Sequence, residues 1–170
     1  EHRSAAALAD HAERQGFRVQ RGVAGLPTAF VATYGKGRPV IGVMGEYDAL
    51  PGLSQKALPE KMPLAEGAGG HGCGHNLFGA ASLGAAIAIK EQIESGQLEG
   101  TVVFFGTPAE EDVGGKTYMV RDGLFRDVDA VLAWHPSDET QADMTSSQAM
   151  VDLSVEFRGK AAHAAYDPWN

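Results

Sequence analysis

The sequence of 170 residues has a single cysteine, Cys73, so the chain cannot form an internal disulfide. It has no run of Lys or Arg, and its formal net charge of −8 disfavours binding to a phosphate backbone. No apolar stretch approaches the ~20 residues that span a bilayer. No basic segment followed by an apolar one opens the sequence, as a secretory signal would. These absences predict a cytoplasmic protein with no nucleic-acid partner and no membrane insertion.

The composition is typical of a folded globular chain, with 44% hydrophobic and 21% charged residues. The length suits one domain with a core and the start of a second, since domains most often have ~100–150 residues. The sequence opens at Glu1, inside a helical pattern, rather than at a Met. We therefore expect residues upstream of it to be missing from the sequence.

Apolar residues recur at helical or strand spacing along most of the chain. We predict helices over Ser4–Gln15, His75–Glu94 and Lys116–Arg121, and strands over Thr28–Tyr34, Pro39–Met44, Thr101–Gly106 and Ala130–Trp134. Gly35 and Gly37 suit a hairpin connection between the first two strands. Residues 52–72 are rich in glycine and proline and have no period, which predicts an irregular loop of the kind that often carries function. Strands that alternate with helices predict an α/β sheet.

The pattern changes after Pro136. Between Ala149 and Phe157, apolar residues alternate with polar ones, which predicts a one-sided antiparallel strand. We therefore expect an α/β domain over residues 1–143 and the beginning of an α+β domain over residues 144–170.

Residues that can bind a metal or move a proton follow the predicted strands. They are Asp48, the adjacent pair Glu110 and Glu111, and His135. Ligands of α/β sheets gather at the carboxyl ends of strands, and one carboxylate of an adjacent pair can ligate a metal while the other acts as a general base. Each residue also fits a structural role: Asp48 as a turn cap, the glutamates as a solvated loop, and His135 as a structural histidine.

Cys73 and His75 lie in the glycine-rich segment Gly70–Asn76, where flexible backbone can aim both side chains at one point. A thiolate with an imidazole favours zinc, and manganese or cobalt is also compatible. A buried inert cysteine beside a loop histidine is the simpler alternative, and a nucleophilic Cys73 with a histidine base is a third. His163, among small residues, fits either an accessible functional imidazole or an exposed one without a role.

Together these segments resemble the M20 metallopeptidase family, specifically its amidohydrolase branch and, within it, the p-aminobenzoyl-glutamate hydrolases of the B-subunit type. The resemblance covers nearly the whole chain and is carried by GEYDALPGL (45–53), GHGCGHN (70–76), GTPAEE (106–111), GGKTYMVRDGLFRDVDAVLAWHP (114–136) and FRGKAAHAA (157–165). Two positions depart from the family pattern. Glu46 stands where other branches have a ligating histidine, and Asn76 stands where many members of this branch have Asp.

The resemblance implies a mixed-sheet, zinc-peptidase-like catalytic domain joined to a lid or dimerisation domain. It implies two divalent metal ions, manganese or zinc, with cobalt or nickel as alternatives. The implied ligands are Cys73, His75, Glu111 and His135. Cys73 would supply the ligand that the histidine provides in other branches.

The same resemblance implies Glu110 as the general base and His163 as a substrate-binding or oxyanion-stabilising residue. Asp48, from its place at the end of a buried strand, is predicted as a further catalytic residue that orients a ligating imidazole. The expected reaction is hydrolysis of an amide bond in an N-acyl amino acid or dipeptide-like substrate, with p-aminobenzoyl-glutamate first, by water that the metals activate. We expect a homodimer or a hetero-oligomer with a related subunit. Family members continue to a late histidine ligand, so we expect this chain to be a fragment; a non-catalytic, metal-bound fragment or binding subunit is the alternative.

Overall fold

The structure, a computed structural model, describes residues 1–142, 146, 148–151, 153–156, 158–163 and 165–167. These residues fall into two units, Glu1–Asp138 and Glu139–Asn170. All helices and strands in the described part of the chain belong to the first unit. In the second unit, the backbone N–H groups of Tyr166 and Asp167 donate hydrogen bonds to the carbonyl of His163, which forms a turn.

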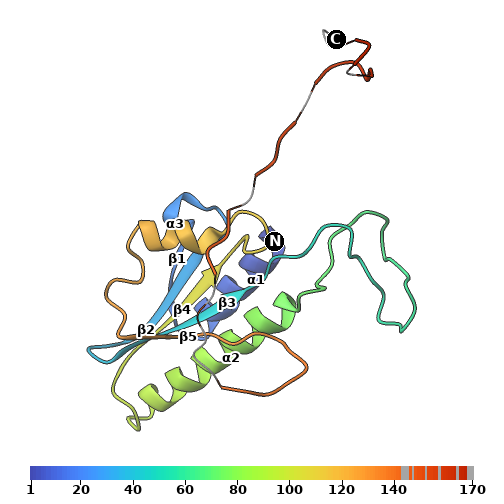
Figure 1. Ribbon diagram of the computed structural model, residues 1–170. Helices are drawn as coiled ribbons and strands as arrows, with labels where there is room; N and C mark the ends of the chain where they lie inside the picture. The colour runs from blue at the N-terminus through green and yellow to red at the C-terminus, as the bar shows by residue number, and fades with distance from the viewer. Residues whose placement is uncertain (143–145, 147, 152, 157, 164, 168–170) are drawn as a thin grey trace. The chain divides into compact units, whose positions relative to one another are not determined.

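The first unit is built on a mixed five-stranded sheet of order β1-β2-β4-β3-β5 (Figure 1). Its strands are β1 (Arg18–Arg21), β2 (Phe30–Lys36), β3 (Val40–Glu46), β4 (Gly100–Thr107) and β5 (Ala130–Leu132). Strands β3, β4 and β5 are parallel, whereas β2 is antiparallel to both β1 and β4. The predicted α/β class is therefore confirmed, and the three parallel strands end at the same edge of the sheet.

Helices cover both faces of this sheet. They are α1 (His2–Arg14), α2 (His75–Glu94) and α3 (Gly115–Arg121), with a short 3₁₀ helix, η1 (Val23–Gly25). On one face, α1 and α2 pack through small residues against Val102 and Phe104; on the other, Met119 of α3 packs with Val103 and Phe105. Successive β4 residues thus enter opposite cores, which explains why residues 102–105 of this strand are all apolar. In the described part of the chain, no helix has both the length and the apolar character needed to cross a membrane.

The hairpin predicted between the strands that are β2 and β3 in the structure is wrong. Strand β4 lies between β2 and β3 and pairs with both, because its two apolar faces suit the centre of the sheet. Gly35 allows this approach, since a Cβ atom there would lie 2.3 Å from the carbonyl oxygen of Gly100. Strand β1 was not predicted, because its sequence RVQR is mostly exposed and shows no apolar period.

The strand predicted over Ala149–Phe157 is also absent from the described residues of that segment, of which Val151, Leu153 and Val155 are exposed. A strand requires a neighbour with which to exchange backbone hydrogen bonds, and the described part of residues 139–170 provides none. Asp152 and Phe157 lie outside the described residues.

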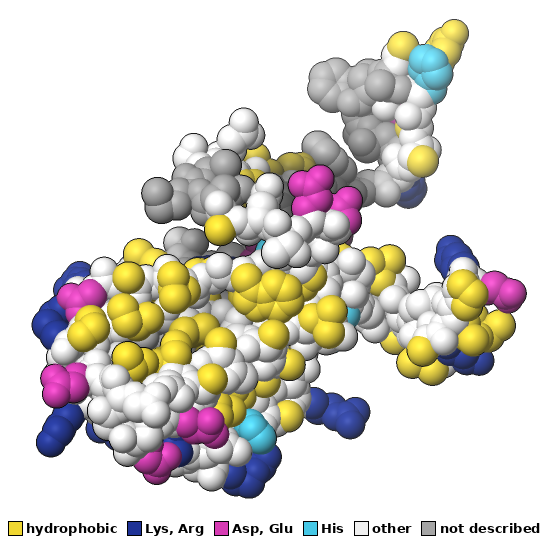
Figure 2. All heavy atoms as spheres, turned by 90° about the horizontal axis from the view of Figure 1, so that it is seen from below, with side chains coloured by type: hydrophobic (Ala, Val, Ile, Leu, Met, Phe, Trp, Pro, Cys, Tyr) yellow, Lys and Arg dark blue, Asp and Glu magenta, His cyan; other side chains and the backbone are white. Residues whose placement is uncertain are grey.

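The irregular loop expected over residues 52–72 is confirmed, and most of it projects from the first unit (Figure 1). A backbone bridge between Leu50 and Gly70 closes its base. Farther out, the Ser54 hydroxyl and the Gln55 amide bind backbone groups of the loop. Figure 2 shows hydrophobic side chains on its surface. The large exposed ones are Leu53, Leu58, Met62 and Leu64. The loop returns the chain to the sheet edge at the segment that contains Cys73.

Two glycines of α2 provide a test of the helix–sheet contact. A Cβ atom at Gly79 would lie 2.6 Å from the backbone oxygen of Glu46, whereas one at Gly84 would meet no atom within 4 Å. Gly79→Ala is therefore expected to lower the free energy of unfolding by about 1–3 kcal/mol. Gly84→Ala should raise it by about 1 kcal/mol, because alanine has the higher helix propensity. Urea denaturation of both variants measures the difference, and equal effects would contradict the close contact.

Candidate metal centre

The end of β3 places two carboxylates on one side of the chain. Glu46 and Asp48 both contact His75, while Tyr47 between them points into the core beside Phe30. Burial raises the pKa of Tyr47, so its hydroxyl stays protonated and donates a hydrogen bond of 2.6 Å to the carbonyl of Thr28. This anchor fixes the direction of both carboxylates.

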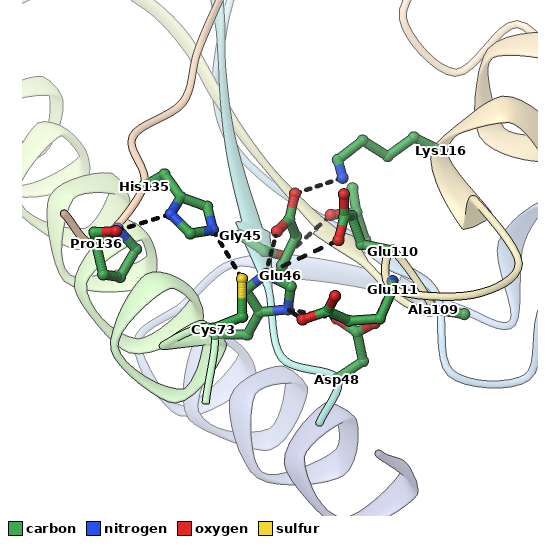
Figure 3. A network of polar contacts seen from close by, with 12 residues as sticks. Gly45, Glu46, Asp48, Cys73, Ala109, Glu110, Glu111, Lys116, His135 and Pro136 are labelled. Atoms are coloured by element: carbon green, nitrogen blue, oxygen red, sulfur yellow. Dashed lines mark hydrogen bonds and ion pairs between the residues drawn. The ribbon is translucent and has the colours of Figure 1, made fainter. Parts of the chain in front are cut away.

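Asp48 holds two parts of the centre together (Figure 3). Its Oδ1 atom lies 2.8 Å from Nδ1 of His75, and its Oδ2 atom accepts a hydrogen bond of 2.9 Å from the backbone N–H of Glu111. A carboxylate only accepts hydrogen bonds, so Nδ1 of His75 carries the proton and Nε2 presents a lone pair. The predicted role of Asp48, to orient a ligating imidazole, stays a prediction, and this hydrogen bond is the contact that it requires.

Two buried acceptor atoms at the centre have no hydrogen-bond partner among the described residues: Nε2 of His75 and Oε1 of Glu111. The His75 side chain is only 1% exposed, and its Nε2 atom lies 2.9 Å from Oε2 of Glu46 without the alignment of a hydrogen bond. An unpaired buried polar atom typically costs about 1–3 kcal/mol. A cation beside Nε2 of His75 would satisfy that acceptor.

Cys73 and His135 form a second pair of donors. The Cys73 sulfur lies 3.4 Å from Nε2 of His135, and Nδ1 of His135 lies 2.9 Å from the carbonyl oxygen of Pro136. Since a carbonyl only accepts, Nδ1 donates the proton there and Nε2 again presents a lone pair toward the thiol. The ring of His135 lies edge-on to that of His75, with the centroids 5.6 Å apart.

The electrostatics of the centre are dominated by negative groups. Burial raises the pKa of the Cys73 thiol, and the carboxylates of Glu111, Glu110 and Glu46 raise it further. A divalent cation has the opposite effect on a thiol, because a coordinating thiol is deprotonated. The protein alone therefore disfavours the thiolate, which a bound metal ion would stabilise.

The donor atoms form two groups that share His75. Cys73, His75 and His135 form the first group, and Glu46, His75 and Glu110 the second; within each, the ligand atoms lie within 4.8 Å of one another. The first group offers sulfur and nitrogen, which zinc binds well, and the second adds carboxylate oxygens, which suit manganese as well. Together with the two unpaired acceptors, this donor set fits divalent metal ions.

Glu110 differs from Glu111 in its surroundings. Its side chain is 43% exposed against 19% for Glu111, and its Oε2 atom lies 4.0 Å from Nε2 of His75. The preceding Ala109 has a φ of 52°, a left-handed conformation that turns the chain sharply after β4. Glu110 thus reaches the second donor group and is open to solvent, whereas Glu111 is held inward.

Of the predicted site residues of the first unit, Cys73, His75, Glu110 and His135 lie in the two donor groups, and Asp48 contacts His75. Glu111 lies beside them but belongs to neither group: its Oε1 atom is 3.8 Å from Nδ1 of His75. His163 belongs to residues 139–170, and its role stays a prediction. Two contributions were missed. Glu46 was assigned no role, although it is buried beside His75, and Lys116 was not singled out, although its ammonium group pairs with Glu46. A carboxylate that ends a buried apolar strand could have indicated Glu46.

The fold and the centre define a class: an α/β protein with a cluster of metal donors at the carboxyl ends of parallel strands. Residues 42–168 match the family described as Peptidase family M20/M25/M40. The chain belongs to this family.

Three relatives place the chain within the family. It is 49% identical to the B subunit of the p-aminobenzoyl-glutamate hydrolase of Escherichia coli K12, over 97% of this chain and 34% of that protein. It is 37% identical to the Xaa-Arg dipeptidase of Homo sapiens, over 85% and 32%. The structure of Bacillus subtilis YXEP, a dinuclear metal binding peptidase from the M20 family, superposes with a TM-score of 0.68 at 27% identity, over 81% and 37%. The chain thus spans about a third of the length of the curated relatives that it matches.

Proposed function

We propose that this chain provides most of the catalytic centre of a metal-dependent amidohydrolase. The supporting observation is the pair of buried, unpaired acceptors, Nε2 of His75 and Oε1 of Glu111, together with the two groups of sulfur, imidazole and carboxylate donors that share His75. A protein that used this cluster only for stability would pair these atoms, since buried polar groups are otherwise almost always hydrogen-bonded.

In this proposal, two divalent metal ions, manganese or zinc, are held by Cys73, His75, Glu111 and His135. When bound, such ions polarise a carbonyl group and lower the pKa of water. The protein itself keeps both imidazoles in the tautomer that presents Nε2, through the acceptors at Asp48 and Pro136.

Glu110 is the general base of the proposed reaction. Its exposed carboxylate can take a proton from water and pass it to the nitrogen of the leaving amine, so that the amide C–N bond breaks and a carboxylic acid and an amine are released. Glu111 is less suited to this role, because its backbone N–H is bound by Asp48 and its side chain is more buried. His163, in residues 139–170, would stabilise the oxyanion or bind the substrate.

The proposed substrate is an N-acyl amino acid or a dipeptide-like amide. p-Aminobenzoyl-glutamate is the first choice, because a relative named for its hydrolysis is 49% identical over 97% of this chain. A dipeptide with a C-terminal arginine is the second, from the 37% identity to the Xaa-Arg dipeptidase. The first relative is named as one of two kinds of subunit, which supports a hetero-oligomer with a related subunit, and a homodimer is the alternative. Residues 144–170 would begin the lid or dimerisation domain.

Metal analysis combined with an amide-hydrolysis assay tests this function. We expect the purified protein to bind about two metal ions per chain, to hydrolyse p-aminobenzoyl-glutamate, and to lose that activity on dialysis against a chelator. Cys73→Ser should lower the bound metal. Bound metal without hydrolysis of either substrate would indicate a non-catalytic binding subunit. Activity that survives the chelator and is lost on thiol alkylation would instead indicate a cysteine nucleophile.

A further inference from the structure

Glu46 lies closer than Glu110 to the free nitrogen of His75. Its Oε2 atom lies 2.9 Å from Nε2 of His75, whereas Oε2 of Glu110 lies 4.0 Å away. Glu46 ends β3 and is nearly buried, with 8% of its side chain exposed. A carboxylate is costly to bury unless it is paired or binds a metal, so this position calls for a specific interaction.

Lys116 forms an ion pair with one carboxylate oxygen of Glu46 and does not bind the other oxygen. Its ammonium group, from the start of α3, pairs with Oε1 of Glu46 (Figure 3). This pairing fixes the rotation of the carboxylate and leaves Oε2 on the side of His75. Two acceptors, Oε2 of Glu46 and Nε2 of His75, therefore face each other at 2.9 Å. The two atoms are not aligned as a hydrogen bond, and the proton of the imidazole is already held at Nδ1 by Asp48. A cation bound by both atoms would satisfy the two acceptors.

We propose that Glu46 is a metal ligand, which together with His75 holds one ion, while Cys73 and His135 belong to the other. This assignment rests on the proposed metal-dependent function. It adds Glu46 as a ligand and states which residues bind which of the two ions. His75 has a single free nitrogen, so it can serve only one ion. This pairing places together free donor atoms that lie 2.9 Å apart, in Glu46 and His75, and 3.4 Å apart, in Cys73 and His135.

The two sites then differ in their chemistry. The Glu46 site has imidazole and carboxylate donors and no thiolate, so it suits a harder ion such as manganese. The Cys73 site has a thiolate and an imidazole and favours zinc or cobalt. Glu110, at 4.0 Å from His75 and open to solvent, stays available as the base. Different affinities for the two ions follow from this division.

Titration of the metal-free protein with Co²⁺ alone tests the division, because a thiolate bound to Co²⁺ gives a charge-transfer absorption that carboxylate and imidazole ligands do not. The unaltered protein should bind about two equivalents, one of which produces this absorption. Glu46→Gln should weaken the other equivalent by at least about 100-fold, because a ligand matters more than the outer partners whose loss costs 10–100-fold. The thiolate absorption should remain.

Two further variants complete the test. Glu46→His restores a donor of a different kind and should regain the second equivalent, while Glu66→Gln, on the projecting loop, should change nothing. If Glu46→Gln binds both equivalents with unchanged affinity, Glu46 is not a ligand. If it loses the thiolate absorption as well, the two sites are not divided as proposed. If the unaltered protein binds no Co²⁺, the metal-dependent function itself fails, which is a separate result.

Discussion

Glu110→Gln is expected to lower kcat for amide hydrolysis by about 10²- to 10⁴-fold, the usual contribution of a positioned general base. The substitution keeps the size of the side chain and removes only its ability to take up a proton. Because Glu110 is 43% exposed and its nearest carboxylate oxygen lies 4.0 Å from Nε2 of His75, the bound metal should change little. Steady-state kinetics and elemental analysis of the same preparation measure both quantities.

Asp112→Asn provides the matched control for this variant. Asp112 is exposed on the same turn and has no contact described with the donor cluster, so its neutralisation alters the local charge by the same amount. Its kcat should stay within about twofold of the unaltered value, since an exposed charge interacts only weakly with the centre. If both variants lose activity equally, Glu110 acts through the local charge rather than as a base. Full activity of Glu110→Gln would exclude it as the base.

The sequence could predict that the site residues lie close together, because their positions depend on local patterns. Periodicity identified α2 and three of the sheet strands nearly to their ends, and a parallel arrangement brings the residues after such strands to one edge. Asp48, Glu111 and His135 therefore meet near His75 without any knowledge of the exact sheet order. The wrong hairpin did not change this outcome, since β3 and β4 are parallel and end together.

What could not be predicted depends on contacts between distant residues. The Lys116–Glu46 ion pair joins positions 70 residues apart and is invisible to any local period. The left-handed backbone of Ala109 occurs at a residue that rarely adopts it, and only the surrounding hydrogen bonds, such as that from Gly114 N–H to its carbonyl, support it. The order of the strands likewise depends on which strand has the apolar faces that best suit the centre of the sheet. The sequence of one strand alone does not reveal this.

Asp48→Asn is expected to lower the affinity for the metal by about 10- to 100-fold, the usual cost of losing an outer partner of a metal ligand. Asp48 accepts two hydrogen bonds, one from Nδ1 of His75 and one from the N–H of Glu111. The amide of Asn has only one accepting oxygen. Its NH₂ group must therefore face one of these two donors.

Either orientation of the amide harms the centre. If the NH₂ group faces His75, the imidazole must move its proton to Nε2, which then has no lone pair for a metal. If it faces Glu111, the N–H of that residue loses its acceptor and the ligating carboxylate loses its anchor. Asp122→Asn, on the exposed end of α3, is the control and should leave the affinity unchanged. Competition with a chelator of known affinity measures both variants, and an unchanged affinity in Asp48→Asn would show that the orientation of His75 does not depend on this carboxylate.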